Sequence, residues 1–193
     1  MANYILQYYQ KITDGSIITG RWIQLLYKYI VTGLENKDFV LDQKKANNAI
    51  DWIESHCFHV EGELAPNPLK LELWQKAMLS CMFGICDPDT NRRRFRETVL
   101  IIARKNGKTS MIAGLAWAVS ILQRHSGSVC YIVASALKQT LQAFHFLTFS
   151  IKYHKLEDKF EIKDNSFDHS IKYTFRKENG TPDGSMEIIA MPS

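Results

Sequence analysis

One short stretch near the middle of the sequence combines the groups that hold phosphate. Nucleoside triphosphates are bound by backbone N–H groups at a helix N-terminus, by a lysine that reaches the β and γ phosphates, and by a hydroxyl on Mg²⁺. Gly107, Lys108 and Thr109 provide these parts in that order. The candidate phosphate-binding residues are Arg104, Lys105, Asn106, Gly107, Lys108, Thr109 and Ser110. This stretch predicts a triphosphate site with Mg²⁺, in which Thr109 is the metal ligand.

The stretch departs from the usual pattern G-x-x-x-x-G-K-[ST], because Ile102 stands where the first glycine is expected. Its surroundings favour the site nevertheless. Thr98–Ala103 is an apolar, β-branched run that predicts a strand buried on both faces, and an apolar helical stripe follows the loop. The alternative is a simple turn with a solvated Lys108. A lysine at a helix N-terminus is unfavourable, because its charge opposes the macrodipole. A bound anion would offset this, so the lysine favours the phosphate site over the simple turn.

Upstream of this loop, Gln75 is a candidate for recognising adenine. A glutamine amide can donate and accept at once, and so can pair with the N6 and N7 edge of that base. Gln75 would make the site specific for ATP. Its neighbour Trp74 is a candidate base-stacking residue, although a tryptophan on a helix is more often part of a core.

Helical spacing dominates the first part of the chain. It appears after Gly20, again after Asp42, which is a candidate N-cap, and in the helix that carries Trp74. Glu61–Pro68 interrupts the pattern with glycine and prolines and predicts a linker. We therefore expect a helical lead segment over residues 1–65 and a second domain over residues 66–193.

The second domain reads as strand, loop, helix, strand. Val129–Ala134 is another apolar strand, and with the strand before the loop it predicts a right-handed βαβ unit. A further amphipathic helix follows, and then Ile171–Arg176 and Ser185–Met191 predict a hairpin. The expected fold class is α/β, with a parallel sheet core of the P-loop NTPase type, a helical N-terminal segment and a C-terminal β-hairpin.

Bulk composition limits the class of protein. The 193 residues carry 46% apolar and 23% charged residues and a net charge of +4, which excludes a disordered chain and a collagen-like fibre. No apolar run approaches the ~18 residues of a membrane-spanning helix. Four irregularly spaced cysteines and the lack of a signal segment in Met1–Gln10 predict free thiols in a reducing cytoplasm.

Three other clusters are weaker candidates. The spacing of the cysteines and histidines around His56 does not match that of a structural zinc site. The arginines of Asn91–Glu97 would suit either a DNA backbone or a solvated loop, and both interpretations stay open. Asp164, Asp168 and His169 are interpreted as loop residues, because no partner residue fixes a catalytic geometry.

At Gly20–Ile23, at Leu71–Gln75 and above all at Ile102–Ser110, the sequence resembles the large terminase subunit of tailed bacteriophages. In that family the N-terminal half is a packaging ATPase and the C-terminal half a nuclease, and the phosphate loop commonly lacks the first glycine. The resemblance implies that Lys108 holds phosphate in a catalytic role, that Arg104 senses or polarises the γ-phosphate, and that Gln75 recognises adenine. Such an arginine stabilises transition-state charge.

The resemblance also implies partners: double-stranded DNA, a small terminase subunit and a portal protein, with a ring oligomer only in the assembled motor and no membrane. It places the protein in the cytoplasm of a bacterial host, as a phage or prophage product. The Asp-Glu strand that hydrolysis requires and the nuclease acids do not occur in this sequence. We therefore expect a truncated chain with little or no ATPase activity by itself.

Two other interpretations stay open. A helicase-like or restriction-type DNA translocase could share both the glutamine and the phosphate loop. A non-catalytic docking module would use the helical lead segment to engage a partner. The terminase ATPase is the primary hypothesis, because Ile102–Ser110 is the most specific of the matching segments.

Overall fold

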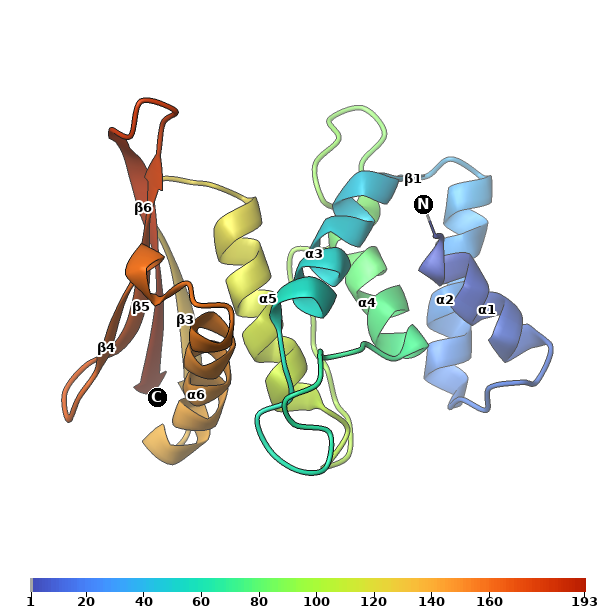
Figure 1. Cartoon of the computed structure of the whole chain (residues 1–193). Coiled ribbons are helices and arrows are strands. Elements are labelled where there is room, and N and C mark those ends of the chain that lie inside the picture. Colours follow the sequence, from blue (N-terminus) through green and yellow to red (C-terminus); the bar gives the residue numbers. More distant parts are fainter. Residues whose placement is uncertain (1) are drawn as a thin grey trace. The chain divides into compact units, whose positions relative to one another are not determined.

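The structure is a computed structural model that describes residues 2–193 (Figure 1). Its contacts divide the chain into two compact units. The first contains the residues up to Asp51 together with Lys70–Ile101, and the second contains Trp52–Leu69 together with Ile102–Ser193. No helix in the described part of the chain has the length and apolar character needed to cross a membrane.

The first unit is mostly helical. It holds α1 (Tyr4–Thr13), α2 (Arg21–Glu35), the start of α3 (Gln43–His56) and α4 (Leu73–Gly84), with a short antiparallel pair of β1 (Val40–Leu41) and β2 (Ile85–Cys86). Its core residues are Ile5, Tyr8, Tyr27, Ile30, Val31, Phe39, Ala77, Cys81 and Ile85. Within α1, α2 and α4 these side chains recur at helical spacing, which is why each of those helices buries one stripe.

Local sequence explains where these helices begin. Gly20 is the N-cap of α2 and lies in extended backbone. Asp42 Oδ1 accepts a hydrogen bond from the Lys45 N–H at 3.0 Å, which satisfies one of the free donors in the first turn of α3. The predicted helix starts after Gly20 and Asp42 are therefore confirmed.

The second unit is built on a four-stranded mixed sheet. Its strands are β3 (Ser128–Ala134), β4 (Phe160–Asp164), β5 (His169–Arg176) and β6 (Pro182–Pro192), in the order β3-β6-β5-β4. The β3–β6 pair is parallel, and the β6–β5 and β5–β4 pairs are antiparallel. Helices α5 (Lys108–Leu122) and α6 (Leu137–Tyr153) lie on one face of this sheet, and the short helix η1 (Glu157–Lys159) precedes β4 (Figure 1).

An aromatic cluster fills the core of the second unit beneath α5. The Trp117 side chain is fully buried and meets the rings of Trp52 and Phe160 edge-on, with centroids 5.8 and 6.0 Å away. Gly114, one turn before Trp117, allows close approach, because a Cβ there would lie 3.1 Å from Cys57 Sγ. Helix α5, which begins directly after Gly107, is thus tightly packed along its buried side.

Two predictions about the sheet are wrong. Thr98–Ala103 forms no strand, and Val99 and Ile101 are 86% and 89% exposed. Its composition suits a strand, but a strand also needs a hydrogen-bonded partner, and no described strand pairs with it. The expected βαβ unit through the loop is therefore absent, and the sheet is mixed where a parallel one was predicted. The β3 strand and the β5–β6 hairpin are confirmed.

Candidate phosphate-binding site

The predicted phosphate loop is a tight turn that leads directly into α5. Lys105 and Gly107 both have left-handed backbone, with φ of 65° and 66°, whereas Asn106 between them does not. Backbone whose handedness alternates in this way turns successive N–H groups toward one concavity, an arrangement that binds anions. The loop from Arg104 to Gly107 therefore has backbone geometry suited to a phosphate group.

The Asn106 side chain holds this turn in shape. Its Nδ2 donates to the Ala103 carbonyl at 3.3 Å and to the Arg104 carbonyl at 3.2 Å. Both carbonyls are thereby tied to the amide, which reinforces the turn that carries Lys105 in left-handed backbone. Sequence reasoning had placed Asn106 in the loop only by position, and the structure gives it a bracing role.

The N-terminus of α5 adds free donors and a positive dipole. Gly107 is its N-cap and has no side chain to cap the helix, and the first turn contains no acidic residue. The first bond of the helix runs from the Met111 N–H to the Gly107 carbonyl at 3.0 Å. Within residues 2–193, the N–H groups of Lys108, Thr109 and Ser110 have no hydrogen-bond acceptor. Donors of this kind, at the positive end of a helix, form an anion site.

The loop and the first residue of α5 carry three cationic side chains. Arg104, Lys105 and Lys108 are exposed, and none of them forms an ion pair with another described residue. Their positive charge is therefore not neutralised by a neighbouring carboxylate, and it adds to the helix dipole. An anion with several negative charges would be attracted to this end of α5.

The site has a hydroxyl for a metal ion but no protein cage for one. Thr109 is exposed in the first turn of α5. Among residues 2–193, no group of three or more His, Cys, Asp or Glu side chains could hold a metal ion. Mg²⁺ commonly combines one or two protein ligands with substrate phosphates and water, so Thr109 could serve as a ligand to Mg²⁺ that arrives with a nucleotide.

Trp74 and Gln75 belong to the first unit, whereas the loop belongs to the second. Gln75 is 6% exposed, and its Oε1 accepts a hydrogen bond from the Glu72 N–H at 2.8 Å. The Glu72 side chain accepts in turn from the Gln75 N–H, which completes a capping box at the start of α4. Trp74 is half-buried and packs against the core of the first unit. Both residues therefore have structural roles, which sequence reasoning gave only to the tryptophan.

Sequence reasoning treated Asp164 and His169 as loop residues and missed His145. His169 Nδ1 lies 2.8 Å from Asp164 Oδ1, and His145 Nε2 lies 3.8 Å from Asp164 Oδ2. The carboxylate, on the last residue of β4, thus lies between His145 of α6 and His169, the first residue of β5. His145 lies 19 residues before Asp164 (164 − 145) and on another element, so no local spacing could have indicated this contact.

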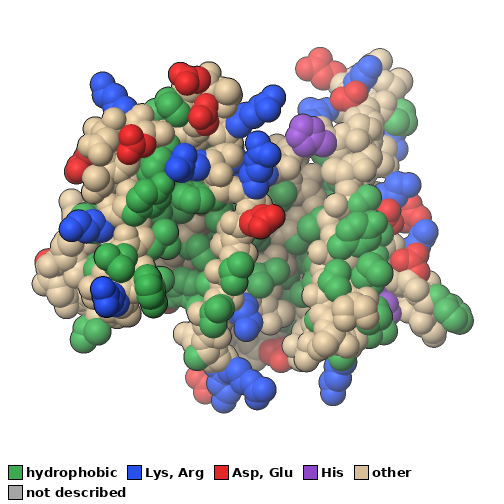
Figure 2. Space-filling model, turned by 180° about the vertical axis from the view of Figure 1, so that it is seen from behind, with side chains coloured by type: hydrophobic (Ala, Val, Ile, Leu, Met, Phe, Trp, Pro, Cys, Tyr) green, Lys and Arg blue, Asp and Glu red, His purple; other side chains and the backbone are tan. Residues whose placement is uncertain are grey.

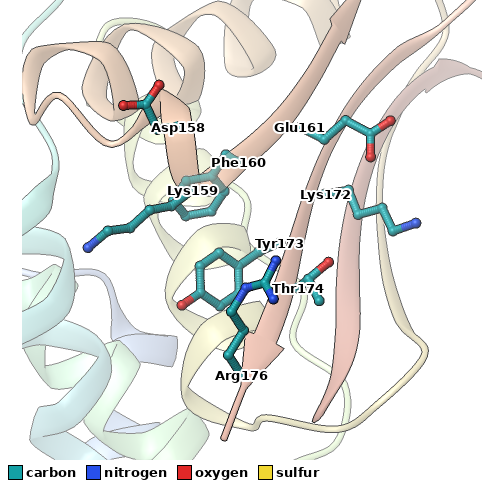
Figure 3. Close-up of a pocket in the computed structure, with 8 residues that line it drawn as sticks. All are labelled: Asp158, Lys159, Phe160, Glu161, Lys172, Tyr173, Thr174 and Arg176. Carbon is teal, nitrogen blue, oxygen red and sulfur yellow. The ribbon is translucent and has the colours of Figure 1, made fainter. Parts of the chain in front are cut away.

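A separate hollow of about 510 Å³ lies on the β4–β5 side of the second unit (Figure 3). Its lining residues are Asp158, Lys159, Phe160, Glu161, Lys172, Tyr173, Thr174 and Arg176. The Tyr173 ring packs against Phe160 at 4.9 Å, while Glu161 and Lys172 are directly paired across the two strands. Acids and bases are mixed here, so this hollow does not share the uncompensated positive charge of the loop.

Comparison with known proteins identifies a similar domain. The model of the family described as terminase large subunit, ATPase domain, matches residues 73–182. The large terminase subunit of Enterobacteria phage HK97 is 34% identical over 71 residues, which are 37% of this chain and 13% of that protein. The crystal structure of the HK97 large terminase superposes with a TM-score of 0.59 and 22% identity, covering 77% of this chain and 27% of the other. The chain thus spans about a quarter of the length of that solved structure.

Proposed function

We propose, from the premise that this chain belongs to the family of terminase large subunit ATPase domains, that its loop at Arg104–Gly107 and the start of α5 bind the phosphates of ATP with Mg²⁺. The observation that carries this proposal is the turn in which left-handed Lys105 and Gly107 open an uncapped helix. A core of the P-loop NTPase type goes with this proposal, with the difference that Thr98–Ala103 before the loop forms no strand. Ile102 stands where the usual pattern has its first glycine, and the Asn106 side chain braces the turn that follows.

Each loop residue takes a distinct role in this proposal. Lys108 reaches the β and γ phosphates, and the Thr109 hydroxyl binds Mg²⁺. Arg104 is exposed and not paired with a described carboxylate, so its guanidinium is available to the γ-phosphate. Backbone N–H groups of the loop and of the first turn, including that of Ser110, donate hydrogen bonds to the remaining phosphate oxygens.

The whole protein is proposed to couple ATP hydrolysis to the translocation of double-stranded DNA in a phage packaging motor and to carry a nuclease as well. It would act as a ring oligomer in the assembled motor, in the cytoplasm of the bacterial host. A small terminase subunit and a portal protein are the proposed protein partners. The family match supports this proposal, and the chain covers 27% of the HK97 terminase structure.

The helical first unit offers a surface for such a protein partner. On α2 the side chains of Trp22, Leu25, Leu26 and Tyr29 are exposed, at spacings of three and four residues that place them on one side of the helix. Trp22 is 80% exposed. An ATP-independent complex with the small subunit or the portal protein, lost in Trp22→Ala, would support a docking role for α2.

The proposed nucleotide site is tested by isothermal titration with a slowly hydrolysed ATP analogue and Mg²⁺. Lys108→Ala should weaken binding roughly tenfold to a hundredfold, because it removes a charge-assisted contact to phosphate. Lys152→Ala is the matched control, because Lys152 is an exposed lysine at the opposite, C-terminal end of α6. Equal affinity of the Lys108 variant and the parent chain would refute the phosphate-loop assignment.

Adenine recognition by Gln75 has its own test, because the capping box permits a clean substitution. Gln75→Glu keeps an acceptor at this position of the box, since glutamate and glutamine both serve there, but it removes the amide donor. We expect α4 to stay intact by circular dichroism while the preference for ATP over GTP is lost. A preserved preference would show that Gln75 is only a capping residue.

A further inference from the structure

The first unit carries a strongly basic hollow that the nucleotide site does not use. Its volume is about 460 Å³, and it is lined by Asp87, Thr90, Arg92, Arg93, Arg94 and Arg96. Lys and Arg side chains occur in several separate groups on the face shown in Figure 2, so basic charge alone does not single out a binding surface. The hollow differs because four arginines and a single acidic residue line it.

That carboxylate is already engaged by its own turn. Asp87 Oδ1 accepts hydrogen bonds from the Thr90 N–H at 2.8 Å, from Thr90 Oγ1 at 2.8 Å and from the Asp89 N–H at 3.2 Å. No ion pair joins Asp87 to an arginine in residues 2–193. Hydrogen bonds from Thr90 lower the pKa of Asp87, and the charge of Arg94 contributes less. One carboxylate against four arginines still leaves most of the positive charge of the hollow uncompensated.

Two of the arginines are held in place by aromatic rings. The Arg93 guanidinium lies over the Phe83 ring at 5.4 Å, and that of Arg94 lies over the Phe39 ring at 5.1 Å. Arg94 Nη2 also donates to the Tyr29 hydroxyl at 2.9 Å. A guanidinium group that lies over a ring face contacts it through its π system, so N–H donors in the guanidinium plane stay available to an anion. Less conformational entropy is then lost when an anion binds.

The backbone of this segment is fixed as well. The Lys45 ammonium donates to the Asn91 carbonyl at 2.8 Å, and the Arg94 N–H donates to the Ile85 carbonyl at 2.9 Å. The N–H groups of Asn91 and Arg92 are also used within the turn. The hollow therefore offers side-chain donors on a rigid frame and lacks the convergent backbone N–H groups that cradle a triphosphate.

We infer that this hollow binds the phosphate backbone of nucleic acid, with Arg92 and Arg96 as contacting residues beside the ring-held Arg93 and Arg94. Guanidinium groups bind successive phosphates without reading bases, so binding is independent of sequence and sensitive to salt. The inference deepens the proposed function, on which it rests for double-stranded DNA as the nucleic acid. It assigns to the first unit a contact surface separate from the nucleotide loop.

The test is binding of a short fluorescent DNA duplex to the whole chain, measured by anisotropy between about 50 and 200 mM salt. Arg92→Ala/Arg96→Ala is the informative variant, because within residues 2–193 these two side chains form no hydrogen bond or ion pair. Lys28→Ala/Lys70→Ala is the matched control, since it removes the same charge from exposed positions of the same unit outside the hollow.

For the arginine variant we expect Kd to rise roughly tenfold at low salt, and the slope of log K against log salt to become shallower by about 1.8, or ~0.9 for each lost phosphate contact. The control should retain the parent slope.

Equal losses of DNA affinity in both variants would overturn the inference, because net charge alone would then explain the binding. Absence of duplex binding by the parent chain would overturn it as well. Loss of ATP-analogue binding in the arginine variant, with DNA binding intact, would reassign the hollow to nucleotide. Lys108→Ala distinguishes the two sites, because it should weaken nucleotide binding and leave this DNA contact unchanged.

Discussion

Lys108 should destabilise the nucleotide-free protein, although it is the residue proposed to bind phosphate. It is the first residue of α5, in a turn that has no side-chain cap and no acidic residue. A surface charge in a terminal helical turn contributes about 0.3–1 kcal/mol, and a cation is unfavourable at the N-terminus. Replacing Lys108 with glutamine, which has a similar helix propensity, should therefore raise the free energy of unfolding by about that amount while nucleotide binding is weakened.

The opposite end of a neighbouring helix provides the control. Lys152 lies in the last turn of α6, where a cation is favourable, so Lys152→Gln should lower the free energy of unfolding by a similar amount. Both lysines are exposed and belong to the second unit. The two variants thus share the same chemical change and should have opposite signs, differing by about 0.6–2 kcal/mol.

Urea unfolding measures this difference. Trp22→Phe/Trp74→Phe is a suitable background, because emission then comes from Trp52 and Trp117 of the second unit. The measurement is made at low salt and repeated near 1 M salt, where the Debye length falls to about 3 Å and the difference should shrink. If Lys108→Gln lowers the stability as Lys152→Gln does, or if the difference persists at high salt, the charge–dipole account of this site is refuted.

Three further outcomes follow from the second unit and from the buried thiols. Trp117→Ala should destabilise the second unit by about 3–5 kcal/mol in urea unfolding, because removal of this fully buried ring leaves a cavity. Trp117→Phe should lower the free energy of unfolding clearly less, because it keeps an aromatic ring in the core. Gly107→Ala should lower stability by about 1–2 kcal/mol and weaken nucleotide binding in calorimetry, since φ is 66° there. Burial raises the pKa of the Cys57 and Cys81 thiols from 9.0 to about 12. Between these values the thiols ionise in the unfolded chain and stay protonated in the folded one, so the urea midpoint should fall as the pH rises from 9 toward 12. The fall should be smaller in the Cys57→Ala/Cys81→Ala chain, which lacks both thiols.

Much of the helical architecture could be predicted from the sequence, because its signals are local. The start of α3 follows from Asp42, whose carboxylate caps the first turn. The β5–β6 hairpin follows from alternating apolar residues and from the turn-forming glycine Gly180, which has φ of 81°. Each of these features depends on residues within a few positions of one another.

The strand expected at Thr98–Ala103 shows where local signals fail. Its β-branched residues favour extended backbone, and the segment has no helical structure. Whether extended backbone becomes a strand depends on hydrogen bonds to another strand, which are made by residues far away in the sequence. The neighbour order β3-β6-β5-β4 is equally non-local, since no spacing within β3 specifies that β6 pairs with it in parallel.

At the phosphate loop, the residue types could be predicted but the conformation could not. The usual pattern relies on two glycines, whereas this loop has Gly107 alone and places Lys105 in left-handed backbone, which costs of order 1–3 kcal/mol for a residue with a side chain. The Asn106 amide offsets that strain by binding two carbonyls of the same turn. A glycine at position 105 would relieve the strain but would remove a cation from the site. Lys37, Asn91, Arg124 and Lys155 also have positive φ, so strain by itself does not mark a site. Lys105 differs because it adds a cation beside the uncapped start of α5, which is what a role in binding an anion predicts.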